Sequence, residues 1–325
     1  MKVPILVGII AVMVGLSQSS APATTTELTA LRAEATAPEV AAPAPTKPVS
    51  SRSHPWPSHT SSAKPKTVLM KTGHWFVYSH GCDTVRTRRD VVIHFHGAHT
   101  TVIPRYIASG LDAVLVIINL GIGSGAYSDA LPLKANVDGL LRRIETGIAE
   151  ECSLEDASIT RLALSSWSAG YGAVEQFLRF RPELVDAVLL ADGLHVGFTD
   201  KRLRTVNVDS LGVFVEFAQK ATRRERLMSI THSGIITEGY AAAAETAMAV
   251  SQAVHAPTWT VSGTKYGMQR VTAARRGNFF VEGFAGNDKP AHARHLYAIG
   301  KTSFTRLRKY WEREDHVRQT QQQHE

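Results

Sequence analysis

The stretch from Arg161 to Phe180, RLALSSWSAGYGAVEQFLRF, constrains the fold of this chain more than any other. It begins with the apolar run Leu162–Leu164, which is typical of a buried parallel strand. The small residues that follow predict a sharp turn with Ser168 at its apex. After the turn, Val174 and Phe177 lie at the spacing of one apolar helix face. The stretch therefore predicts a strand, a tight serine turn and a helix in direct succession.

Such a turn brings the strand and the helix close together, so the residues two positions before and after its apex must be small. Here they are Ser166 and Gly170. At these residues the chain resembles the α/β-hydrolase superfamily of serine esterases and lipases, whose turn reads G-x-S-x-G. The motif of this chain is the variant S-x-S-x-G, because Ser166 takes the place of the first glycine. The resemblance implies that Ser168 is the nucleophile of a Ser-His-Asp triad.

Strand and helix patterns alternate along the rest of the chain. Continuous apolar runs predict buried strands, and apolar residues at helical spacing predict helices. We therefore expect an α/β fold of the α/β-hydrolase type: one domain with a mostly parallel sheet, helices on both faces, and functional residues at the carboxyl ends of the strands. The expected strands are 68–79 (one or two strands), 90–97, 113–120, 161–164, 185–191, 226–231 and 279–284, and the expected helices beyond the serine turn are 137–148, 213–224, 239–254 and 296–311.

Residues 1–23 have the pattern of a secretory signal peptide, with an apolar run that ends at a possible Ala-Pro-Ala cleavage site. The run is shorter than the roughly 20 apolar residues that span a bilayer, although an uncleaved signal anchor is the alternative and would bring the protein to a membrane. Residues 24–66, rich in Ala, Pro, Ser and Thr, predict a disordered linker. The domain is expected at 67–317, before a polar tail at 318–325. We expect the protein to be secreted, periplasmic or located in the cell envelope.

The chain contains two cysteines, Cys82 and Cys152, and an exported protein can join them in a disulfide. Each precedes a strand, at 91–95 and 161–164, and these strands would be neighbours in the sheet. We expect a structural Cys82–Cys152 disulfide away from the active site. Two unpaired thiols are the alternative.

The formal net charge of +7 comes from dispersed basic residues without aromatic residues between them, so we expect no nucleic-acid partner. No cofactor is expected, because the glycines at 121–125 do not open a dinucleotide-binding helix. His94, His96 and His99 are the residues that a histidine metal site would use. Burial in a strand explains these side chains, and no clustered carboxylate or cysteine accompanies them, so no metal is expected.

A serine hydroxyl needs a neighbouring base to take its proton, and the base needs a third group to orient it. In the α/β-hydrolase superfamily the base follows the last strand and precedes the closing helix. His292 occupies that place in this chain, and His295 is the local rival.

The acid is expected at Asp192, which ends the apolar strand 185–191 at a position that some members of the superfamily use. The commoner position follows the strand 226–231, where the first carboxylate is the alternative acid, Glu238. Asp209 and Asp288 are two further candidates for the acid. Asp192 could also serve a structural purpose by accepting backbone N–H bonds of a loop.

Two backbone N–H groups should stabilise the oxyanion. The resemblance places one at Ala169, after the nucleophile, and the other at Ala98, in the turn after the third strand. The expected substrate pocket lies nearby, and its candidate residues are His96, Trp167, His195 and His232.

The sequence thus predicts an exported serine hydrolase, most readily a carboxylic ester hydrolase that forms an acyl-enzyme from a small-molecule or polymer ester. A peptidase or amidase of the same fold is one alternative. The other is a non-catalytic relative that binds cell-envelope material, which the missing first glycine keeps open.

Overall fold

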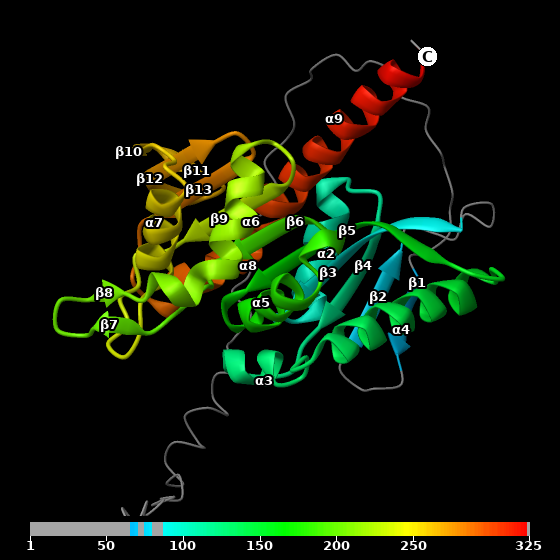
Figure 1. The fold of residues 1–325 in the computed structure, drawn as a ribbon, viewed down its shortest axis with the longest axis horizontal. Helices are drawn as coiled ribbons and strands as arrows, with labels where there is room; N and C mark the ends of the chain where they lie inside the picture. The colour runs from blue at the N-terminus through cyan, green and yellow to red at the C-terminus, as the bar shows by residue number, and fades with distance from the viewer. Residues whose placement is uncertain (1–65, 71–74, 80–86, 324–325) are drawn as a thin grey trace, which may run out of the picture. The chain divides into compact units, whose positions relative to one another are not determined.

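The structure is a computed structural model that describes residues 66–70, 75–79 and 87–323. A large sheet lies at its centre, in the strand order β1-β2-β4-β3-β5-β6-β9-β13-β12-β10, with β11 paired to β12 (Figure 1). A separate hairpin joins β7 and β8. The strands are β1 (Lys66–Met70), β2 (Trp75–Ser79), β3 (Arg88–Phe95), β4 (Val114–Ile118), β5 (Ser158–Trp167), β6 (Val185–Ala191), β7 (Phe198–Asp200), β8 (Thr205–Val206), β9 (Leu227–His232), β10 (Thr258–Thr260), β11 (Thr264–Lys265), β12 (Met268–Arg276) and β13 (Phe279–Phe284).

The six central strands, from β4 to β13, are parallel to one another. Both edges are antiparallel, with β1 and β2 on one side and β12 and β10 on the other. The predicted mostly parallel sheet is confirmed. The sequence analysis missed the β10–β12 edge, because exposed and half-buried positions such as Gln269 and Arg270 interrupt β12 and leave no continuous apolar run.

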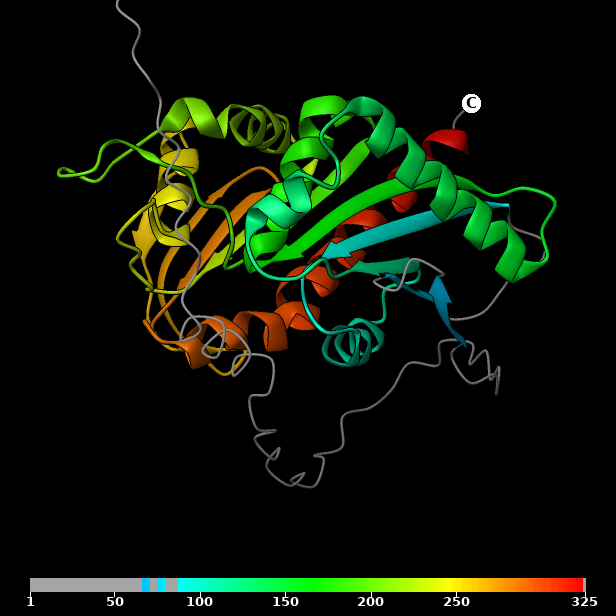
Figure 2. The same cartoon turned by 90° about the horizontal axis from the view of Figure 1, so that it is seen from below.

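Helices cover both faces of the sheet, and each face has its own core (Figure 2). The alternation of side chains along a strand divides them between the cores: Val91 and Ile93 belong to one, and Val92 to the other. Helices α3 to α7 pack on the first core, and α2, α8 and α9 on the second. The helices are α2 (His99–Ser109), α3 (Ser124–Ser128), α4 (Lys134–Cys152), α5 (Tyr171–Phe180), α6 (Gly212–Thr222), α7 (Ala243–Ala253), α8 (Lys289–Ile299) and α9 (Thr305–Gln322).

The closing helix differs from the prediction at both ends. It begins at Lys289, because the Asp288 side chain accepts the Ala291 N–H at 2.8 Å and Pro290 favours the first helical turn. It passes through a π-helical turn at Gly300–Phe304 and continues to Gln322. Residues 318–322, expected in a polar tail, are therefore helical, since Arg and Gln are good helix formers.

Several predictions concern residues outside the described part of the chain, namely the signal peptide at 1–23 and nearly all of the linker at 24–66. Cys152 is the buried last residue of α4, but Cys82 also lies outside the described residues, so the disulfide stays a prediction. Among the described residues, no helix is both long and apolar enough to cross a membrane.

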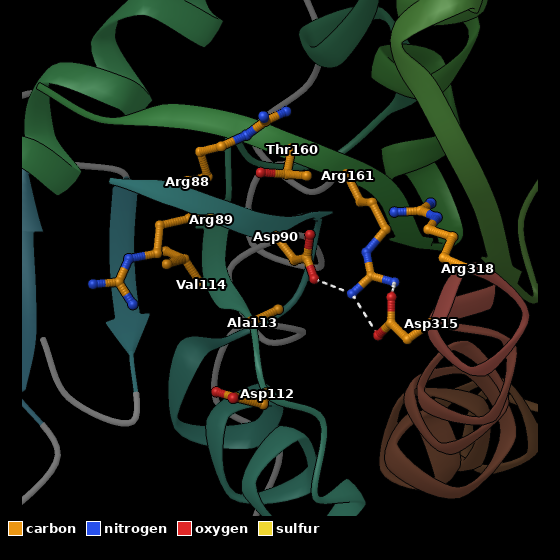
Figure 3. Close-up of a pocket in the computed structure, with 10 residues that line it drawn as sticks. All are labelled: Arg88, Arg89, Asp90, Asp112, Ala113, Val114, Thr160, Arg161, Asp315 and Arg318. Atoms are coloured by element: carbon orange, nitrogen blue, oxygen red, sulfur yellow. Dashed lines mark hydrogen bonds and ion pairs between the residues drawn. The ribbon is translucent and has the colours of Figure 1, made fainter. Parts of the chain in front are cut away.

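The amino-terminal end of the parallel sheet holds an ion-pair network around Arg161 (Figure 3). The guanidinium donates to Asp90 of β3 and, at 2.8 Å, to Asp315 of α9, and it lies 4.8 Å from the centre of the Trp311 ring. A cavity of about 290 Å³ opens beside these residues. It lies at the opposite end of β5 from Ser168, so the network joins strands to the last helix and has no part in the serine site.

Candidate active site

Ser168 follows directly on β5, in a single 3₁₀ turn that leads into α5. Its φ of 48° lies in the left-handed region. Holding a residue other than glycine in this conformation costs about 1–3 kcal/mol of conformational energy. Position 170 has room only for glycine, because a Cβ there would lie 2.2 Å from the carbonyl oxygen of Phe95, at the end of the neighbouring strand β3. The side chain of Ser166 is fully buried at the corresponding position before the apex. Strained backbone at a strand end presents Ser168 outward.

The loop after β6 packs against this turn. Asp192 also has a positive φ, 46°, and a Cβ on Gly193 would lie 2.3 Å from the Ser168 carbonyl oxygen. Glycine is therefore required at position 193. The sequence shows the glycine, but its contact with a turn 25 residues earlier is a long-range relationship.

The buried carboxylate of Asp192 accepts two hydrogen bonds. Its Oδ2 accepts from His292 Nδ1 at 2.7 Å, and its Oδ1 accepts from the Ser233 backbone N–H at 2.6 Å. Burial opposes the charge of this carboxylate. The bond to His292, the positive charge of nearby histidines and the Ser233 N–H outweigh it and lower the pKa of Asp192 to about 2. Asp192 therefore both caps the loop at Ser233 and orients an imidazole.

His292 lies in the first turn of α8, one helical turn earlier than the sequence analysis placed the start of that helix. Because the carboxylate can only accept, Nδ1 carries a proton, so in the neutral imidazole the free electron pair is on Nε2, as in a general base. Ser168, Asp192 and His292 line one cavity of about 170 Å³ together with His195 and Tyr240.

Trp167 stacks on two imidazole rings and is not among the residues that line this cavity. Its ring stacks on His292 at 4.7 Å and on His96 at 5.0 Å, and its Nε1–H donates to the His292 carbonyl oxygen at 3.2 Å. His96 is in turn bonded through Nδ1 to the Tyr127 hydroxyl at 2.8 Å. A row of rings thus connects the ends of β3 and β5 to α8.

A second, larger cavity of about 490 Å³ adjoins Ser168. His195 borders both cavities, and its Nδ1 donates to the Ala241 carbonyl oxygen at 3.0 Å. Burial lowers the pKa of His195, and it lowers that of His96 to about 4, so both rings are neutral near pH 7. The sequence analysis did not find two tyrosines of this site, Tyr171 and Tyr240, because isolated tyrosines carry no motif. The larger cavity is lined by His96, Ile122, Gly123, Ser124, Ser168, Ala169, Tyr171, His195, Val196, Gly197 and Tyr240.

Three other predicted residues lie away from these two cavities. His232 is buried, with Nδ1 bonded to the Ser233 carbonyl oxygen at 2.9 Å, and it lines neither cavity. The alternative acid Glu238 is exposed, and the cavity linings do not include it. Ala98 is exposed as the N-cap residue of α2, whereas the other predicted oxyanion donor, Ala169, borders the larger cavity.

The rival base His295 and two of the candidate metal ligands, His94 and His99, have other partners. His295 is buried and bonded to Thr231 Oγ1 at 2.9 Å. His94 is buried and bonded to Ser165 Oγ at 2.9 Å, and His99 stacks on Phe76 with ring centres 3.6 Å apart. Within the described residues, no group of three or more His, Cys, Asp or Glu side chains could hold a metal ion.

No family model matches the chain, and no curated protein matches its sequence. Solved structures do resemble it at low identity. Siderophore hydrolase EstB from Aspergillus nidulans is 13% identical over 76% of this chain and 96% of its own, with a TM-score of 0.36. Acetyl xylan esterase from Aspergillus awamori is 11% identical over 69% and 93%, with a TM-score of 0.40. Est1E from Butyrivibrio proteoclasticus is 11% identical over 77% and 100%, with a TM-score of 0.39.

The decisive observations on the fold are in the chain itself. Its parallel sheet has helices on both faces, and a serine turn connects the central strand β5 to α5. The chain has the α/β-hydrolase fold. In this fold the carboxyl ends of β5 and β6 lie side by side, which brings Ser168 and Asp192 to the same edge of the sheet.

Proposed function

We propose that this protein is an exported serine hydrolase that cleaves carboxylic esters through an acyl-enzyme. The hydrogen bond between Asp192 and His292, in the same cavity as Ser168, is the observation that carries the proposal. A buried carboxylate, an imidazole held in the base tautomer and a serine on a strained turn are the three parts that nucleophilic catalysis needs.

In the proposed reaction, Ser168 Oγ attacks the ester carbonyl carbon while His292 Nε2 takes its proton. The carbonyl oxygen becomes an oxyanion, which the backbone N–H group of Ala169, at the larger cavity, stabilises. When the tetrahedral intermediate collapses, the bond to the alcohol oxygen breaks and His292 returns the proton to that oxygen. Water then repeats the sequence on the acyl-enzyme and releases the acid.

Asp192 stays ionised throughout this cycle. Its pKa of about 2 keeps it negative at neutral pH, so it stabilises the imidazolium that forms on His292. It need not accept a proton itself.

A fluorophosphonate probe, which reacts with activated serines, tests the proposal. We expect labelling of the wild-type protein and turnover of p-nitrophenyl acetate, both abolished by Ser168→Ala. Ser166→Ala is the matched control: this neighbouring serine is buried and its hydroxyl has no hydrogen-bond partner in the described structure. We expect this variant to keep its labelling.

Absence of labelling in folded wild-type protein, or labelling that survives Ser168→Ala, would contradict the proposal. The first result would favour the non-catalytic binding protein. Turnover of p-nitroanilides in preference to p-nitrophenyl esters would favour the amidase.

A further inference from the structure

Two cavities of unequal size meet at Ser168. The cavity of about 490 Å³ extends past Ala169 and His96, and the cavity of about 170 Å³ extends past His292 and Asp192. Ser168, His195 and Tyr240 border both. A carbonyl carbon bonded to Ser168 Oγ would therefore lie where both cavities begin.

The proposed chemistry assigns the alcohol and the acyl group of the ester to different cavities. The alcohol oxygen must lie beside His292, because that imidazole donates the proton with which the alcohol leaves. The alcohol therefore belongs on the side of the smaller cavity, which His292 lines. The acyl group then extends away from His292 into the larger cavity, which Ala169 lines and His292 does not.

The volumes of the two cavities limit the sizes of the acyl group and of the alcohol. The larger volume falls within the range of about 300–1,000 Å³ that is usual for small-molecule sites, and the smaller one falls below it. The larger cavity thus has room for a ring or a branched chain. The smaller one has less room and suits the smaller half of the ester.

The lining of the larger cavity carries no full charge. Among the described residues that border it, none is Lys, Arg, Asp or Glu, and burial keeps His96 and His195 neutral near pH 7. The rings of Tyr171 and Tyr240 and the aliphatic Ile122 contribute apolar surface. A charged acyl group would lose its hydration there without gaining an ionic partner.

We propose that the substrates of this protein are esters of a bulky, uncharged carboxylic acid with a small alcohol. The larger cavity holds the acyl group, and the smaller cavity holds the alcohol. This assignment rests on the proposed serine hydrolase function.

Two constitutional isomers test the assignment. Ethyl 3-phenylpropanoate has a bulky acyl group and a small alcohol, and 3-phenylpropyl acetate has the reverse, with the same atoms in both. We expect kcat/KM to be higher for ethyl 3-phenylpropanoate by about 10-fold or more. Ethyl 3-(4-carboxyphenyl)propanoate is the same ester with a negative charge on its acyl group. It should be a poorer substrate than ethyl 3-phenylpropanoate. Equal values for the isomers, or the opposite preference, would overturn the assignment.

A variant that fills the larger cavity tests whether this cavity causes the preference for a bulky acyl group. Gly197 lines this cavity, and a Cβ there meets no atom within 4 Å, so Gly197→Leu can place a side chain in it. We expect it to lower the kcat/KM ratio of the two isomers by about 10-fold. Gly212→Leu is the matched control, because Gly212 also has open space but lies at the start of α6, outside both cavities. It should leave the ratio unchanged.

The outcomes separate the two proposals. If the wild-type protein is neither labelled by the fluorophosphonate nor able to cleave any ester, the hydrolase proposal fails and the cavity assignment fails with it. If the protein is labelled and active but prefers 3-phenylpropyl acetate, only the cavity assignment fails. An unchanged ratio in Gly197→Leu, with labelling and thermal stability retained, would also overturn it.

Discussion

The indole of Trp167 stacks on the imidazole of His292, with ring centres 4.7 Å apart and an angle of 29° between the planes. The same indole donates its N–H to the His292 backbone at 3.2 Å. Asp192 fixes one edge of the imidazole, and Trp167 covers one of its faces. Trp167 therefore acts as a positioning residue in the proposed mechanism, and it is not among the residues that line the two cavities at Ser168.

Removing this ring should reduce turnover more than binding. We expect Trp167→Ala to lower kcat for p-nitrophenyl acetate by about 10²-fold, because His292 would lose the ring that stacks on its imidazole and keeps it in place. KM should change little. Trp167→Phe keeps an aromatic face without the N–H and should restore much of the loss, as steady-state kinetics would show.

The position of the imidazole can also be followed without activity. A proton held between His292 Nδ1 and the Asp192 carboxylate should give a far-downfield proton NMR signal. We expect the signal in wild type and Trp167→Phe, and its weakening in Trp167→Ala. A full signal in Trp167→Ala together with low kcat would contradict a positioning role.

The choice of acid leads to a second prediction. Asp192→Asn should lower kcat by roughly 10³–10⁴-fold, because an amide can donate to Nδ1 and so favour the wrong tautomer of His292. The matched control is Glu238→Gln, at the alternative acid, which is exposed and outside the cavity that holds His292. The prediction would be wrong if Glu238→Gln lost activity while Asp192→Asn kept it.

Local patterns in the sequence were enough to predict most of what positions Ser168 and Asp192. The strand β6 matches its predicted bounds, and β5 and α5 flank the predicted turn, because each is a run of apolar residues at a single period. Asp192 follows from the same reasoning, as the polar residue that ends a buried strand. The start of α8 was not predicted: the sequence analysis began the closing helix at 296, whereas the helix begins at Lys289 after the N-cap residue Asp288.

Contacts between distant parts of the chain could not be read in the same way. Trp167 and His292 are 125 positions apart, and no local pattern indicates that their rings stack. The cavities likewise combine side chains from several loops, such as Tyr171 and Tyr240. Such contacts depend on how the strands are ordered across the sheet and on where each loop turns.

Gly193 provides a third prediction, on stability. A methyl group at this position would lie 2.3 Å from the Ser168 carbonyl oxygen, so Gly193→Ala must push the two loops apart. We expect a loss of about 1–3 kcal/mol in the free energy of unfolding, measured by urea denaturation, together with lower kcat. Gly212→Ala, where there is open space, should cost nothing and controls for the substitution itself. Equal stability of the two variants would contradict the close contact.

The buried histidines should make the protein sensitive to mild acid. Burial lowers the pKa of His94 to about 3 and that of His295 to about 4, whereas the ordinary value is 6.5. Between pH 6.5 and about 4 the unfolded chain binds protons that the folded chain does not. The free energy of unfolding should therefore keep its full value above pH 6.5 and decrease as the pH drops through this window. The decrease is at most about 1.4 kcal/mol per pH unit for each histidine.

Asp192 does not contribute to this loss. Its pKa is lowered from 3.8 to about 2, so the stability that it provides is present above pH 3.8 and is lost only below that value. Urea denaturation at pH 7 and pH 5 measures the effect of the histidines. In His295→Asn the amide can replace Nδ1 in the bond to Thr231, and we expect a smaller difference between the two pH values than in the wild type. An equal or larger difference in this variant would show that other groups cause the acid sensitivity.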